Sequence, residues 1–252
     1  MSEAPSASPP PPGESIAGRV ADHGAADLAT PAAADPTANA FAELPLELRH
    51  VDATRVVVDK PPGLLSVPGR GPDKQDCAWA RVHARFPEAL IVHRLDQGTS
   101  GLIVYARGEA MQRALSEAFA ARLVDKRYEA VVHGLIERDA FEIDLPLIVD
   151  WPNRPRQMID HARGKPSLTR VRVLARDLDA GTTRVELEPV TGRSHQLRVH
   201  LLAIGHPILG DALYAPPEVL ARAPRLLLHA RDLRLPALLD APALSLHSPA
   251  AF

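Results

Sequence analysis

Cysteine is nearly absent from this chain, which has a single one, Cys77, among 252 residues. An intrachain disulfide is therefore impossible, and a zinc site built from cysteine ligands is excluded. The eleven histidines include no His-x-x-x-His or His-Glu-x-x-His pair, the spacing that would place two metal ligands on one helical face. Histidines scattered in this way are usually surface or core residues, so the sequence predicts no metal site.

Long apolar runs are lacking as well. No stretch is long enough to cross a bilayer as a helix, and the N-terminus has neither the basic start nor the apolar core of a secretory signal. We therefore expect a protein of the reducing cytoplasm with no membrane partner, and a monomer as the default.

Large apolar residues are scarce in residues 1–45, where Ala, Pro, Ser, Gly and Asp dominate and Pro9 to Pro12 are consecutive. Such a segment cannot bury enough apolar surface to offset its ordering entropy. We predict a disordered Ala/Pro-rich extension over residues 1–45 and a single domain over residues 46–252. A regulatory role for the extension stays open.

The charge is unevenly distributed. The whole chain carries a net charge of −2, but residues 1–45 hold six acidic residues and one basic residue. The remainder therefore has 28 basic and 25 acidic residues, a surplus of +3. A surplus this small favours a nucleic-acid partner only if the basic residues cluster.

The densest basic segment is Asp150–Lys165, which contains Arg154 and Arg156 and has Trp151 nearby. Its prolines predict a surface loop, and its composition suits contact with phosphates. A solvated polar connection without a ligand is the alternative.

Apolar spacing predicts a mixture of strands and helices without strict βαβ alternation. This indicates an α+β domain around a mixed or mostly antiparallel sheet. Strands are expected at 54–59, 64–69, 126–134, 142–148, 168–174, 183–187, 226–230 and 233–235, and helices at 75–86, 109–123 and 191–204.

The polar stretch His93–Gly101 lies between apolar segments, which predicts a turn that displays Asp96 between two strands. Asp96 has no obvious second carboxylate partner of the kind that glycoside hydrolysis needs. The chain also lacks the phosphate loop or metal-binding acids of phosphoryl transfer. A guanidinium nearby would keep Asp96 ionised, but spacing alone favours a structural Asp–Arg pair over a catalytic one.

His93–Leu102 reads H-R-L-D-Q-G-T-S-G-L and matches the H-R-L-D-x-x-T-S-G-L signature of the RluA family of pseudouridine synthases. Asp59 stands where the family commonly has Asn before its K-P-x-G-L motif. Further segments resemble the other family motifs in the expected order over residues 46–252: Lys60–Leu64 (K-P-P-G-L), Lys126–Tyr128 (K-R-Y), Thr191–His200 (T-G-R-S-H-Q-L-R-V-H) and Leu228–Ala230 (L-H-A).

Two further segments, Asp144–Gln157 and Gly205–Tyr214, resemble the RluA subtype within that family. The S4 RNA-binding module of several sister enzymes would precede Leu44, and the segment there is too short and polar to be one. The resemblance thus implies a lone catalytic domain over residues 46–252. It also implies the pseudouridine synthase fold, in which helices flank a mixed, mostly antiparallel sheet with a catalytic cleft.

The resemblance implies an isomerase that converts uridine in RNA to pseudouridine without a cofactor or metal. Asp96 takes the position of the essential aspartate, which either attacks C1′ of the ribose or assists elimination to a glycal. Tyr128 takes that of a tyrosine that stacks on the target base, with proton transfer as an open second role. Arg198 aligns with the arginine that pairs with the carboxylate, and Arg94 with one that fills the space left by the flipped uridine.

The subtype resemblance implies tRNA and large-subunit rRNA as partners, with uridine 32 of the anticodon loop and uridine 746 of a 23S rRNA hairpin as targets. We expect Arg154 and Arg156 to contact substrate phosphates. A sister specificity for another rRNA uridine is the main alternative. A non-catalytic RNA-binding homologue, and a nucleosidase that would release free uracil, are the competing classes.

Overall fold

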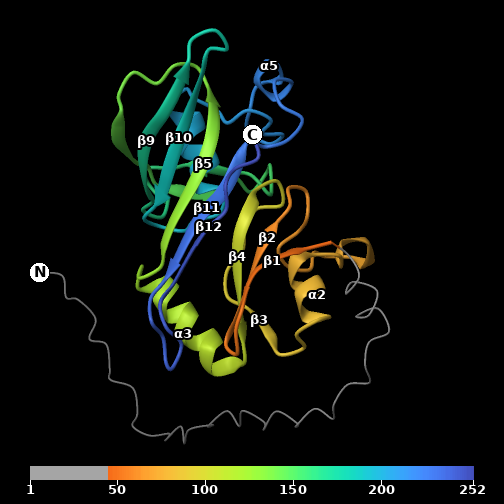
Figure 1. The fold of residues 1–252 in the computed structure, drawn as a ribbon. Helices are drawn as coiled ribbons and strands as arrows, with labels where there is room; N and C mark the ends of the chain where they lie inside the picture. The colour runs from red at the N-terminus through yellow and green to blue at the C-terminus, as the bar shows by residue number, and fades with distance from the viewer. Residues whose placement is uncertain (1–44) are drawn as a thin grey trace, which may run out of the picture. The chain divides into compact units, whose positions relative to one another are not determined.

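The computed structural model describes residues 45–252 (Figure 1). Our prediction of a disordered extension over residues 1–45 lies outside the described residues except for Pro45.

The described residues form a ten-stranded sheet in which all neighbouring strands are antiparallel except the central pair β4–β11, which is parallel. The expected α+β class with a mixed, mostly antiparallel sheet is therefore confirmed. The strand order is β1 (Glu47–Val51), β2 (Arg55–Lys60), β4 (Ser100–Arg107), β11 (Leu228–Leu235), β5 (Asp125–His133), β10 (Thr182–Pro189), β9 (Leu168–Asp177) and β6 (Ala140–Asp144), with β3 (Ala89–Ile91) beside β4 and β12 (Leu244–His247) beside β11.

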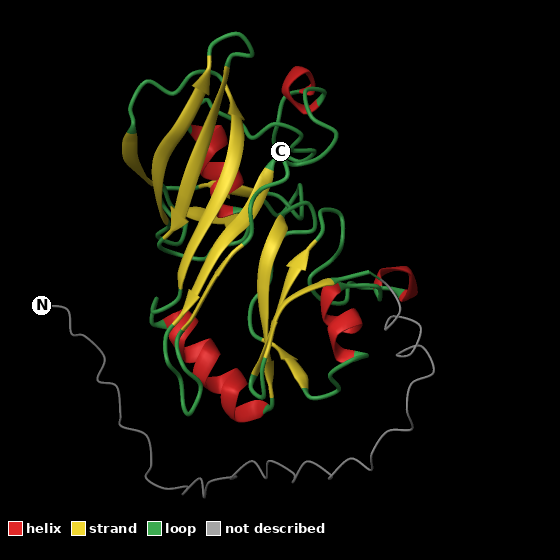
Figure 2. Cartoon of the chain, in the orientation of Figure 1, coloured by secondary structure: helices red, strands yellow, loops and turns green. Residues whose placement is uncertain are grey.

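A few short helices flank this sheet, and Figure 2 shows α4 behind the strands β5, β9 and β10. A separate two-stranded hairpin is formed by β7 (Leu147–Val149) and β8 (Gln157–Ile159). The helical elements are η1 (Pro72–Lys74), α2 (Ala78–His83), α3 (Glu109–Ala120), α4 (Gln196–Ala203) and α5 (Pro217–Leu220).

Strands β2 and β4 are buried on both faces because their apolar residues run without interruption. Val57 and Val104 face α3, whereas Val58 and Ile103 belong to the cluster that α2 covers. Figure 1 shows the two helices on opposite sides of these strands. The apolar residues of α4 pack on β5, β9 and β10 in a third cluster. The centre of the sheet, where β4 meets β11, therefore lies between two separately packed halves.

Two strand predictions need correction. Residues 64–69 form no strand beyond an isolated bridge from Leu65 to Cys77, because the segment between Gly63 and Pro68 is too short to build a ladder. The strand expected over 142–148 is divided into β6 and β7, since Pro146 has no N–H to contribute to a ladder.

Both the first and the third helix predictions were too long. The helix expected over 75–86 is limited to Ala78–His83, and the one expected over 191–204 begins only at Gln196. His195 adopts a left-handed conformation with φ of 55°, so the helix cannot extend past it toward Thr191. The strand expectations for 54–59, 126–134, 168–174, 183–187 and 226–235 are confirmed within a few residues, as is the helix at 109–123.

Candidate active site

Asp96 lies on the connection between β3 and β4, as its sequence context predicts. The amide of Thr99 donates to the carbonyl of Asp96 at 3.1 Å and closes a turn directly before β4. The side chain of Asp96 is only 17% exposed, so the turn holds a half-buried carboxylate over the middle of the sheet.

The Asp96 turn is held from one side by a buried lysine. Lys60, which has no exposed surface, donates its ammonium hydrogens to the carbonyls of Pro61, Leu64 and Gln97 at 2.8 to 3.1 Å. Burial lowers the pKa of Lys60 to about 7, although the charges of Asp96 and Asp59 oppose this shift. The ammonium therefore joins the K-P-P-G-L segment to the residue that follows Asp96.

A serine holds the turn from the other side. Ser66 Oγ donates to the carbonyl of Leu95 at 2.7 Å and accepts from the amide of the same residue at 3.0 Å. Tyr105 on β4 donates its hydroxyl to the Ser66 carbonyl at 3.1 Å. The backbone on both sides of Asp96 is thus fixed by buried groups, which is how a rigid scaffold presents a reactive side chain.

Gly101 allows β4 to approach β11. Its φ is +111°, and a Cβ added there would lie 2.3 Å from the carbonyl oxygen of Ala230 on β11. Only glycine fits this position, because both the conformation and the distance exclude a side chain. This close approach aligns the end of the Asp96 turn with the strand that pairs with Tyr128.

Arg198 on α4 reaches Asp96 from a point 102 residues further along the chain. Its Nη1 lies 3.1 Å from Asp96 Oδ2. Its Nε and Nη2 donate to the two carboxylate oxygens of Asp211 at 2.8 and 2.6 Å. Burial alone would lower the pKa of Arg198, but the hydrogen bonds and charges of both carboxylates raise it above its ordinary value. The guanidinium therefore bridges two acids.

His195 lies beside the second oxygen of Asp96, with 3.8 Å between its Nε2 and Oδ1. Its Nδ1 is 2.7 Å from the hydroxyl of Tyr214, which also accepts a hydrogen bond from the amide of Gln157. Burial lowers the pKa of His195, against the opposing charge of Asp96. A neutral imidazole therefore faces the carboxylate near pH 7.

Tyr128 on β5 is half-buried beneath the same cleft. Burial, with a further contribution from the negative charge of Asp96, raises the pKa of Tyr128 above its ordinary value. The phenol therefore stays protonated at neutral pH. The structure brings Asp96, Tyr128 and Arg198 together in one cleft, from a loop, a strand and a helix.

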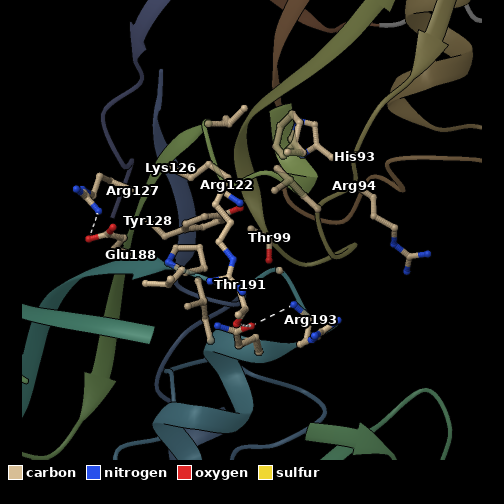
Figure 3. A pocket seen from close by; sticks show the side chains of 18 of the residues that line it. His93, Arg94, Thr99, Arg122, Lys126, Arg127, Tyr128, Glu188, Thr191 and Arg193 are labelled. Atoms are coloured by element: carbon tan, nitrogen blue, oxygen red, sulfur yellow. Dashed lines mark hydrogen bonds and ion pairs between the residues drawn. The ribbon is translucent and has the colours of Figure 1, made fainter. Parts of the chain in front are cut away.

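The cleft has a volume of about 900 Å³, and several basic side chains line it (Figure 3). Arg94 is exposed and lines the cleft, but Figure 3 shows its guanidinium directed away from Tyr128. The other basic residues of the lining, which the sequence did not single out as a group, are Arg122, Lys126, Arg127, Arg170 and Arg193.

Arg154 and Arg156 lie on the turn between β7 and β8 and are absent from the lining of this cleft. The guanidinium of Arg154 stacks on Trp151 at 4.5 Å from the ring centroid. That of Arg156 lies 5.3 Å from the ring centroid of Tyr214, so Arg156 is linked to the site through this tyrosine while Arg154 is not.

Sequence reasoning missed the roles of Lys60, Asp211 and Tyr214. All three lie in segments that resemble family motifs, Lys60–Leu64 and Gly205–Tyr214. A motif does not show which of its residues are buried. A lysine two positions after three consecutive valines was the one available signal, because a charge at the end of a largely buried strand needs dedicated partners.

Within residues 45–252, no group of three or more His, Cys, Asp or Glu side chains is arranged to hold a metal ion. Over the same residues, no helix combines the length and apolarity needed to span a membrane.

Comparison with known proteins now adds to this geometry. Residues 54–203 match the family model described as "RNA pseudouridylate synthase". The "Dual-specificity RNA pseudouridine synthase RluA" of Pasteurella multocida is 50% identical over 207 residues, which cover 82% of this chain and 94% of the relative. The protein of the same name from Yersinia pestis is 55% identical over 184 residues, covering 73% of this chain and 89% of the relative.

Among solved structures, "Human RNA Pseudouridylate Synthase Domain Containing 1" superposes with a TM-score of 0.69 at 31% identity, and the match covers 81% of this chain and 83% of the human one. Its fold supports the assignment that the sequence relatives provide. The chain therefore belongs to the RNA pseudouridylate synthase family and is an RNA pseudouridine synthase, an isomerase related to the RluA enzymes.

Proposed function

We propose that Asp96 is the carboxylate that carries the isomerisation. The reaction breaks the bond between N1 and C1′ of a uridine and joins C5 to C1′, after which C5 loses its hydrogen and N1 gains a proton. Asp96 either attacks C1′ or assists elimination to a glycal. The observation that supports this role is its contact with Arg198 in a cleft that also contains Tyr128.

Arg198 and Tyr128 have distinct proposed roles. The Arg198 guanidinium, 3.1 Å from Asp96 Oδ2, orients the carboxylate through a charge-assisted hydrogen bond. Tyr128 stacks on the flipped uracil, which base–aromatic stacking stabilises by about 1–3 kcal/mol. Flipping is needed because the reacting atoms are otherwise stacked within the RNA.

Arg94, Arg154 and Arg156 are the proposed RNA contacts outside this trio. Arg94 is exposed beside the Asp96 turn, a position suited to entering the space left by the uridine. Arg154 and Arg156 are exposed on the β7–β8 turn, where their guanidinium groups are free to contact phosphates.

The proposed substrates are tRNA and large-subunit rRNA, at uridine 32 and uridine 746. The support is the name of the relatives, which describes them as dual-specificity enzymes, together with identities of 50% and 55% over 94% and 89% of their lengths. We further propose that residues 46–252 form the catalytic domain, and that the enzyme acts as a monomer in the cytoplasm, where these RNAs are found.

Asp96→Asn tests the catalytic role, because it keeps the size and hydrogen-bonding atoms of the side chain but removes its charge. We expect it to abolish tritium release from RNA labelled at C5 of uridine, while the full chain still binds the RNA. Normal turnover by Asp96→Asn would disprove the proposal. Free uracil among the wild-type products would instead indicate a nucleosidase.

The target sites are tested separately by mapping pseudouridine in tRNA and 23S rRNA from cells that lack this protein. We expect uridine 32 and uridine 746 to remain unmodified. If both sites are still modified, the proposed specificity is wrong and a sister rRNA site becomes the better candidate.

A further inference from the structure

The guanidinium of Arg198 is divided unequally between two carboxylates. It makes one hydrogen bond to Asp96, at 3.1 Å, and two shorter ones to Asp211, at 2.8 and 2.6 Å. The paired contact with both oxygens of Asp211 fixes the plane of the guanidinium, as a bidentate arginine–carboxylate pair does generally. The contact with Asp96 therefore depends on a plane that Asp211 sets.

Asp211 is itself held rigidly. Its side chain is 1% exposed, and its Oδ1 also accepts hydrogen bonds from the amides of Leu213 and Tyr214 at 3.0 and 3.2 Å. The ring of Tyr214 lies against the guanidinium, 5.0 Å from centroid to Cζ. Asp211 therefore restrains the guanidinium through two hydrogen bonds, and the Tyr214 ring packs against it.

Among residues 45–252, the Arg198 guanidinium forms no hydrogen bond besides those to Asp96 and Asp211. Arginine has several rotatable bonds, so an unrestrained guanidinium would sample many orientations. A displacement of about 1 Å in a catalytic group is enough to reduce a rate by roughly 10²-fold. Loss of the orientation that Asp211 imposes on Arg198 should therefore lower the reaction rate by a measurable factor.

We propose that Asp211 is a positioning residue for the isomerisation, holding Arg198 in the orientation in which its Nη1 contacts Asp96. The inference rests on the proposed function of Asp96. Asp211 does not line the cleft, so it acts through Arg198 and not by touching RNA.

The test uses Asp211→Asn in the full chain. An asparagine amide turned toward Arg198 places a donor against a donor, so one of the two hydrogen bonds to Asp211 is lost. With 5-tritiated transcripts of tRNA and of a 23S rRNA fragment, we expect the single-turnover rate to fall about 100-fold. The apparent Kd for the RNA should stay within about threefold of wild type, because the RNA-contacting surface is unchanged.

Asp52→Asn is the matched control. Asp52 is bound to Arg55, an arginine only 1% exposed, and neither residue lines the cleft. This control also removes the carboxylate partner of a buried arginine, so we expect it to lower Tm while leaving the single-turnover rate unchanged. Equal rate losses in the two variants would show that Asp211 matters only for stability and would overturn the proposal.

Two further measurements keep the inference testable if Asp211→Asn folds poorly or if the proposed RNAs are not substrates. Asp211→Glu keeps the charge and should fold, with a rate between those of Asp211→Asn and wild type; a wild-type rate in either folded variant overturns the inference.

The Nε–H NMR signal of Arg198, assigned by its loss in Arg198→Lys, should exchange slowly with solvent in wild type and rapidly in both Asp211 variants. Slow exchange in the variants counts against the inference even without RNA, whereas absence of tritium release by wild type counts only against the proposed substrates.

Discussion

The ion pair between Asp96 and Arg198 contributes more to the proposed reaction than to the stability of the fold. Both side chains are mostly buried, with exposures of 17% and 7%, and a buried ion pair contributes little net stability because desolvation offsets the attraction. An ionised carboxylate in a fixed orientation is, however, what attack on C1′ or assistance to elimination requires. Removing Arg198 would leave the buried Asp211 carboxylate without its partner and should destabilise the fold. Asp96→Asn leaves Arg198 paired with Asp211, so we expect that substitution to affect the rate far more than the free energy of unfolding, measured by urea unfolding.

Tyr128 provides a prediction at the same scale. Tyr128→Ala removes the proposed stacking surface, so RNA affinity for the flipped state should fall by the equivalent of about 1–3 kcal/mol. Tyr128→Phe keeps the ring and should retain the affinity. Single-turnover titrations with labelled RNA would measure both, and equal loss in the two variants would contradict a stacking role.

The environment of His93 leads us to expect that the free energy of unfolding depends on pH. Its Nε2 accepts a hydrogen bond from the amide of Val104 at 3.1 Å, which requires an unprotonated nitrogen. Burial, followed by the charge of Lys126, lowers the pKa of His93 to about 3, while an unfolded histidine has a pKa of about 6.5.

Because the folded pKa is the lower one, the unfolded chain binds more protons between these two values. The contribution of His93 to stability is therefore complete above about pH 6.5 and is lost as the pH falls toward 3, by up to about 1.4 kcal/mol per pH unit. Urea unfolding of wild type and His93→Gln between pH 7 and 4 measures this difference. Parallel pH profiles of the two proteins would disprove it.

At the scale of elements, the parallel pair β4–β11 is the feature on which the site depends. It is the join between the half of the sheet covered by α2 and α3 and the half covered by α4. The Asp96 turn leads into β4, whereas Tyr128 and Arg198 belong to the other half. A shift along β4–β11 would therefore separate the proposed catalytic groups.

Gly101→Ala tests this dependence. The methyl group would lie 2.3 Å from the Ala230 carbonyl oxygen at a φ of +111°, so clash and backbone strain should together lower the free energy of unfolding by about 3 kcal/mol or more. Gly181→Ala is the control, since Gly181 also has a positive φ, of 59°, but nothing lies within 4 Å of an added Cβ. We expect that change to cost about 1 kcal/mol in urea unfolding; equal costs would show that strain alone matters at Gly101.

At the scale of the whole molecule, ion pairing with acidic neighbours determines which basic side chains remain available to contact RNA phosphates. On strands β5, β9, β10 and β11, arginines pair with acidic neighbours. Arg94, Arg122, Arg154 and Arg156 form no ion pair with any residue in 45–252, and two of them, Arg94 and Arg122, line the cleft. At the cleft itself, Arg94 and Arg122 are therefore the arginines of this group that can contact RNA phosphates without breaking an ion pair.

The salt dependence of RNA binding tests this distribution. Removing one proposed phosphate contact by Arg154→Ala or Arg156→Ala should reduce the slope of log affinity against log salt by about 0.7–0.9. Arg172→Ala should leave it unchanged, because Arg172 is paired with Glu186 at 3.0 Å. Filter binding between 50 and 200 mM salt, roughly the range over which such effects are large, measures the slopes, and a uniform change in all three variants would contradict the assignment.

Patterns within contiguous residues were sufficient to predict the class of fold and the position of Asp96. Apolar spacing in segments such as 126–134 and 168–174 specifies strands whatever their partners, because a strand that buries one or both faces needs that pattern. The signature around Asp96 identified the turn and the family in the same way. These are properties of contiguous residues, and a linear reading detects them.

The contacts between residues far apart in the sequence became known from the three-dimensional fold. Spacing could not reveal that Arg198 is shared between Asp96 and Asp211, since the contact with Asp96 depends on how the two halves of the sheet join at Gly101 and Ala230. Nor could it reveal that Lys60 is buried and donates to the carbonyl of Gln97, 37 residues further along the chain. It also could not show that Arg172 is paired while Arg122 is free, because pairing across β9 and β10 depends on strand register. Contacts of this kind form only when the backbone brings residues far apart in sequence within hydrogen-bonding distance, and no local pattern encodes that distance.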